Sequence, residues 1–87
     1  MAPKILSRRA GRQPKEPLAR KHLFDQAMER YVEWREECLL VEDAYRNWSM
    51  APAEASELPF AAYGAALDRE ESAAAVYGAA VDRLEGP

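Results

Sequence analysis

The sequence predicts an all-α fold, an antiparallel two-helix hairpin of the coiled-coil kind. Two long segments carry apolar residues at a spacing of seven, which is the repeat of supercoiled helices. The segment SMAPAEASELP, with its two prolines, lies between them and allows the chain to turn back. A chain of 87 residues forms one small domain, and such a domain leaves much of its surface exposed. We therefore expect dimerisation, or docking on a partner's helices, to complete a four-helix bundle.

The first 16 residues predict a disordered basic arm, because MAPKILSRRAGRQPKE holds two prolines, a glycine and few apolar residues. Residues 1–22 carry seven cations and one Glu, a net charge of +6, whereas residues 23–87 carry five Arg and fourteen acids, a net charge of −9. The arm is expected to act as a tether or second contact. Its cations, over residues 4–21, are Lys4, Arg8, Arg9, Arg12, Lys15, Arg20 and Lys21.

The helical hairpin is expected to occupy residues 17–87. Pro17 suits the first turn of a helix, and no Gly or further Pro interrupts the chain from there to residue 48. We therefore predict the first helix over residues 17–48. The connection is predicted over residues 49–59, where prolines and small residues gather.

The second helix is predicted over residues 56–85. Ser56 is a candidate N-cap, and Pro59 is tolerated because it falls in the first turn. A Gly-Pro pair after residue 85 ends the helix.

The heptad pattern predicts how the two helices face each other. Within residues 63–83, the phrase Tyr-Gly-Ala-Ala-Leu/Val-Asp-Arg occurs twice, fourteen residues or two heptads apart. In an antiparallel pair each a position faces a d position, and facing residue numbers here sum to 108. Large Trp34 then faces small Ala74, while two glycines, Gly64 and Gly78, leave room for longer side chains opposite. The predicted seam contains Tyr31, Trp34, Cys38, Val41, Tyr45, Trp48, Phe60, Tyr63, Leu67, Tyr77, Val81 and Leu84.

One polar residue falls on the predicted seam. Glu70 takes a d position beside Cys38, and a buried carboxylate without a partner is costly. We expect Glu70 to bend towards solvent and pair with Arg35. A polar layer that sets the helix register is the alternative, and a ligand-binding role is a third.

Apolar residues also extend beyond the seam on both helices. The predicted outer flanks contain Met28, Val32, Leu39, Ala62, Ala66, Ala73, Val76 and Ala80. Small side chains allow another helix to come close, so these flanks predict an association surface. Alternatively, the alanines serve only as good helix formers on a solvated face.

The sequence offers little for catalysis or metal binding. His22 is the only histidine and Cys38 the only cysteine, so we expect no enzyme, no metal site, no cofactor and no small-molecule ligand. There is no apolar run long enough for a transmembrane segment, and a lone cysteine suits a reducing compartment, so a cytoplasmic location is expected.

Two functions remain at the level of the sequence. The first is a helical-hairpin module for protein–protein interaction, either a homodimer or docked on another helical protein. The alternative is a nucleic-acid-associated protein that binds phosphates non-specifically through residues 4–21.

Overall fold

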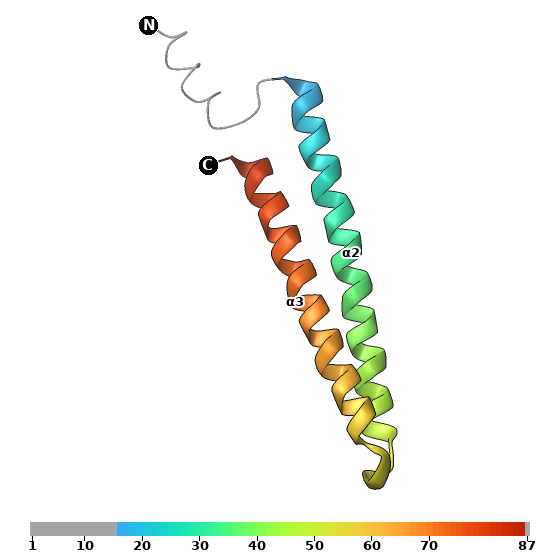
Figure 1. Cartoon of the computed structure of the whole chain (residues 1–87). Helices are drawn as coiled ribbons and strands as arrows, with labels where there is room; N and C mark the ends of the chain where they lie inside the picture. Colours follow the sequence, from blue (N-terminus) through green and yellow to red (C-terminus); the bar gives the residue numbers. More distant parts are fainter. Residues whose placement is uncertain (1–15, 87) are drawn as a thin grey trace, which may run out of the picture.

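The chain is a hairpin of two long antiparallel helices in the computed structural model, which describes residues 16–86 (Figure 1). Helix α2 spans Pro17–Met50 and helix α3 spans Glu57–Glu85, joined through the short 3-10 helix η1, Ala53–Ala55. The predicted all-α hairpin is therefore confirmed. Residues 1–15 of the predicted disordered arm, with five of the seven predicted cations, lie outside the described residues.

The ends of both helices follow their local sequence. Pro17 occupies the first turn of α2, which runs two residues past its predicted end, to Met50. Ser56 stands at the N-cap of α3, but its hydroxyl donates to the carbonyl of Ala53 at 3.0 Å and makes no cap hydrogen bond. Gly86 ends α3 with a φ of 86°, and its N–H donates to the carbonyl of Asp82.

The predicted register of the two helices is confirmed by their aromatic contacts. Three pairs whose residue numbers sum to 108 lie side by side across the hairpin. The ring centroids are 5.5 Å apart for Tyr31 and Tyr77, 5.5 Å for Tyr45 and Tyr63, and 4.9 Å for Trp48 and Phe60. The first turns of α2 extend beyond the end of α3 (Figure 1), and Leu18 in this overhang is 80% exposed.

The line of closest approach differs from the predicted seam by a rotation of each helix. Among the described residues, the buried ones are Ala27, Ala66 and Ala80, at 5%, 1% and 1% exposure. The prediction that Ala66 and Ala80 lie on an outer flank is therefore wrong. These alanines take the g positions of α3, so the helices meet along their d and g positions. The physical reason is size, because two backbones approach most closely where the side chains between them are small.

The same rotation moves the a positions out of the contact. Tyr31 is 38% exposed, Tyr45 52%, Phe60 54% and Leu67 39%, although all four were predicted to lie in the seam. Within the described residues no large side chain is fully buried. The buried core of the hairpin is therefore small and made of alanines, and much of its apolar surface faces outwards.

Candidate interaction surface

Two copies of one aromatic cluster fix the helices to each other. In the first cluster Trp34 stacks on Tyr77 at 5.7 Å and 8°, and Tyr31 meets both rings edge-on. In the second cluster Trp48 stacks on Tyr63 at 5.6 Å and 16°, and Tyr45 meets both edge-on. All equivalent residues are fourteen apart. The repeated phrase of α3 therefore supplies one Tyr to each cluster, and a Tyr-x-x-Trp repeat in α2 supplies the rest.

Glu70 lies between the two helices as a hydrogen-bond acceptor. The indole N–H of Trp34 donates to Glu70 Oε2 at 2.7 Å in a partly buried position. The predicted pairing of Glu70 with Arg35 is wrong, since the Arg35 guanidinium instead lies over the Trp34 ring, 5.8 Å from its centroid. A carboxylate at a d position is satisfied in this way without leaving the contact. Trp34 was predicted to face Ala74, but the hydrogen bond from its indole N–H was not predicted.

The a positions of both helices form one continuous apolar surface, which we call the aromatic face. In an antiparallel pair, residues that have the same heptad letter on the two helices lie on the same side of the hairpin. The exposed a residues therefore share this side. The aromatic face consists of Phe24, Tyr31, Cys38 and Tyr45 from α2 and Phe60, Leu67, Ala74 and Val81 from α3. Five of these eight are between 38% and 54% exposed.

The e positions border the aromatic face on its outer side. On α2, Met28 is 46% exposed and continues the apolar surface. On α3, Gly64 and Gly78 face open space, because a Cβ added to either would meet no atom within 4 Å. The prediction that these glycines make room for side chains of the same hairpin is therefore wrong. Near the connection an open groove crosses the same side, lined by Val41, Glu42, Tyr45, Arg46, Ser49 and Tyr63.

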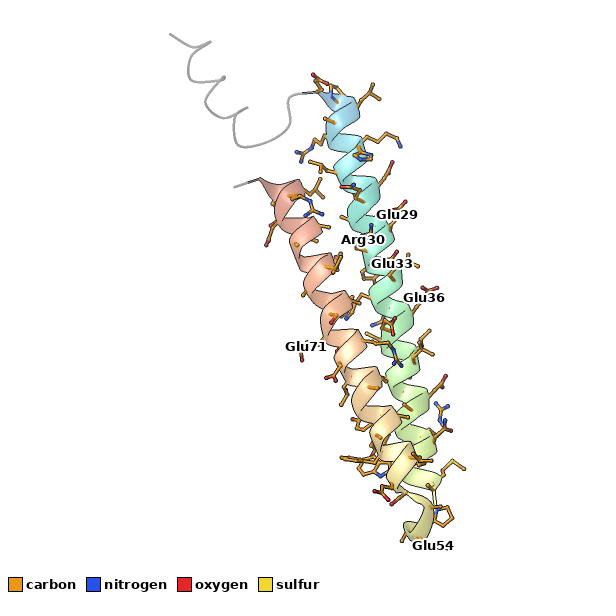
Figure 2. All side chains as sticks on the ribbon, viewed as in Figure 1. Glu29, Arg30, Glu33, Glu36, Glu54 and Glu71 are labelled. Atoms are coloured by element: carbon orange, nitrogen blue, oxygen red, sulfur yellow. The ribbon has the colours of Figure 1, made fainter. Side chains whose placement is uncertain are left out.

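The opposite side of the hairpin is charged. Arg30 donates to both carboxylate oxygens of Glu33 at 2.8 Å, and this hydrogen bond, with the attraction of the same carboxylate, raises the pKa of Arg30. Arg69 Nε lies 3.5 Å from Glu37 Oε1, an ion pair between helices that lacks hydrogen-bond geometry. Figure 2 marks Glu29, Arg30, Glu33 and Glu36 on α2, whereas Glu71, marked on α3, takes an e position beside the aromatic face. This side therefore carries ion pairs within and between the helices, together with the exposed side chains of Leu40 and Val76.

The remaining residues of the predicted flanks lie in several places. Val32 and Leu39, at 52% and 55% exposure, lie on α2 outside its contact with α3, and Val76 is 48% exposed on α3. Ala62 is exposed and Ala73 partly buried. They do not form a single stripe.

The predicted seam is likewise divided. Its partly buried residues are Trp34, Cys38, Val41, Trp48, Tyr63, Tyr77, Val81 and Leu84.

Two of the predicted basic residues, Arg20 and Lys21, lie on the first turns of α2. Lys21 Nζ is 2.9 Å from Asp25 Oδ2.

Within residues 16–86 no group of three or more His, Cys, Asp or Glu side chains is arranged to hold a metal ion. In that same range no helix is long and apolar enough to cross a membrane. The chain matches no known family model, and searches of curated proteins and of solved structures found no match to it. The surface itself is therefore the basis for assigning a function.

Proposed function

We propose that the chain is a small, non-catalytic module for protein–protein interaction, which self-associates or docks on another protein's helices through the aromatic face. One observation carries the proposal: five large apolar side chains at a positions of both helices are at least 38% exposed on one side of a hairpin that buries only alanines fully. Burying a large apolar side chain is worth about 1.5–3 kcal/mol relative to exposure. A partner that covers this face gains several such contributions.

The shape of the face favours helices as the partner. The exposed residues recur every seven positions along two antiparallel helices, so their rows match the ridges and grooves of further helices. A partner's helix also satisfies its own backbone hydrogen bonds, which an apolar surface cannot supply. The basic arm would add an electrostatic contact to such a partner.

A pair of matched substitutions tests this function. Leu67→Glu places a charge on the aromatic face, while Val76→Glu places the same charge on α3 away from that face, at a residue that is also substantially exposed. We expect both variants to keep the helix content of the wild type by circular dichroism. Only Leu67→Glu should abolish association, measured by sedimentation equilibrium of the protein alone and by crosslinking in an extract of the source cell. If both variants associated as strongly as the wild type, with themselves and with the crosslinked partners, the proposed function would be contradicted.

A further inference from the structure

We propose that the aromatic face is covered by a second copy of this chain, related by a two-fold axis parallel to the helices. Each α2 then packs against the partner's α3, and the two connections lie at the same end of a four-helix bundle. This inference rests on the proposed function and names its partner. Its support comes from the geometry of the heptads and from the residues at the e positions.

The angle between the contact of the two helices and the aromatic face fits a four-helix bundle. Heptad columns are about 51° apart round a helix, so the midpoint of d and g lies about 100° from the midpoint of a and e. Each helix of a four-helix bundle meets its two neighbours on sides roughly 90° apart. Since the hairpin uses the d and g positions of both helices, the a and e positions are left at the angle that two further helices require.

The e columns of the two helices match each other in charge and in size. An axis parallel to the helices keeps every residue at its own height, so α2 lies level with the same residues of the partner's α3 as of its own. Facing e positions then have numbers that sum to 106. Arg35 faces the partner's Glu71, and Lys21 faces the partner's Glu85. Met28 faces the partner's Gly78, and Glu42 faces the partner's Gly64. Opposite charges and large-to-small pairs therefore alternate along the contact.

The two glycines give this match its specificity. An interior glycine weakens a helix relative to alanine, so its presence needs a reason. Within the hairpin there is none, because the space before Gly64 and Gly78 is open. In the dimer the side chains of the partner's Met28 and the partner's Glu42 occupy that space.

The other symmetric arrangement is disfavoured by charge. A two-fold axis perpendicular to the helices would place α2 against the partner's α2 and α3 against the partner's α3. With that axis near the middle of the helices, where their overlap is greatest, Arg35 would lie beside the partner's Arg35, and Glu71 beside the partner's Glu71. Like charges that close repel each other, whereas the parallel axis pairs them with opposite charges.

The size of the face is sufficient for a specific dimer. From residue 24 to residue 45 the face is about 32 Å long at 1.5 Å per residue, and two helices are roughly 20 Å wide. Each copy therefore covers on the order of 640 Å², and the pair about 1,300 Å². Specific interfaces bury about 1,200–2,000 Å² in total, so this one lies at the lower end of that range.

A charge exchange tests the arrangement in the full-length chain. Arg35→Glu and Glu71→Arg each place like charges at both facing pairs, so each single variant should dimerise roughly ten- to thirtyfold more weakly than the wild type. An equimolar mixture of the two variants restores both opposite-charge pairs. The mixture should therefore dimerise with nearly the wild-type affinity, as measured by sedimentation equilibrium over a range of concentrations.

The controls carry the same charge changes away from the face. Arg83→Glu and Glu36→Arg alter exposed residues outside the a and e positions and should leave the dimer within about threefold of the wild type. If the wild type is monomeric while the loss of a foreign partner in Leu67→Glu persists, the second copy is refuted and the proposed function stands. If Arg35→Glu weakens the dimer no more than Arg83→Glu does, the arrangement of the two copies is refuted.

Disulfide trapping provides a second readout that does not depend on charge. Met28→Cys and Gly78→Cys are made in separate chains, each also carrying Cys38→Ser, so every disulfide that forms is between chains. Mild oxidation of the mixture should yield a Met28→Cys to Gly78→Cys crosslink, because facing residues of packed helices approach the ~4.4–6.8 Å that joined Cα atoms need. Homodimeric crosslinks of Met28→Cys alone, in place of the mixed product, would overturn the proposal.

Discussion

Replacing Trp34 with phenylalanine separates the hydrogen bond to Glu70 from the stacking of the ring. Trp34→Phe keeps an aromatic ring against Tyr77 but removes the N–H that donates to Glu70 Oε2 at 2.7 Å. A hydrogen bond to a charged group contributes about 1.5–3 kcal/mol. The lost area of the larger ring adds roughly 1 kcal/mol, since the residue is only partly buried.

The second aromatic cluster supplies the matched control. Trp48 stacks on Tyr63 with nearly the same geometry, yet no described residue accepts a hydrogen bond from its indole N–H. Trp48→Phe should therefore cost only the ring area, roughly 1 kcal/mol. The two substitutions should differ by about 1.5–3 kcal/mol in the free energy of unfolding.

Thermal melting at one fixed protein concentration measures the difference, because association also shifts the melting temperature. A loss of 1 kcal/mol lowers the Tm of so small a domain by about 4–8 °C, so Trp34→Phe should melt roughly 10 °C below Trp48→Phe. In a Glu70→Leu background the excess should vanish, since no acceptor remains. Equal melting temperatures for the two Phe variants would refute the role given to Glu70.

Three further tests probe the packing of the hairpin. Ala66→Leu should destabilise the hairpin by about 1–3 kcal/mol in chemical denaturation, because a fully buried position cannot take a larger side chain, whereas Ala65→Leu at its exposed neighbour should change little. Gly64→Ala with Gly78→Ala should raise the helix stability of a monomeric Leu67→Glu chain by roughly 1 kcal/mol per residue, since each added Cβ meets open space; a loss of stability there would contradict the open surroundings. Arg69→Ala should cost at most about 1 kcal/mol, because its ion pair with Glu37 is partly exposed, and melting in high salt should shrink even that difference.

The sequence predicted the helices and their register because the aromatic spacing carries that information directly. Tyr31 with Tyr77 and Tyr45 with Tyr63 lie as the heptads indicate. The rotation about each helix axis could not be predicted, since Ala66 and Ala80 are equally at home on a solvated face and in a tight contact.

The candidate surface follows from that rotation. Tyr45 and Phe60 were predicted to be internal, and their exposure emerges only when the buried alanines are known. The hydrogen-bond partner of Glu70 was not predicted for a related reason. Arg35 was expected to pair with Glu70 because of its charge, whereas the donor in the structure is the neutral indole N–H of Trp34.

The two aromatic clusters repeat the same contacts between Tyr and Trp, so the hairpin is ambiguous along its own length. Sliding α3 by fourteen residues, about 21 Å, would bring a Tyr of one cluster against the Trp of the other. The side chains would lose one cluster and keep one, so the rings alone select the register weakly. The connection, residues 51–56, bridges seven Cα–Cα steps from residue 50 to residue 57, at most about 25 Å when fully extended. A slide of about 21 Å between axes about 9 Å apart needs about 23 Å, so it would require an almost completely straightened connection. The short connection thus fixes the register of the two helices. A chain with a longer connection could pair its helices out of register and form staggered, open-ended assemblies.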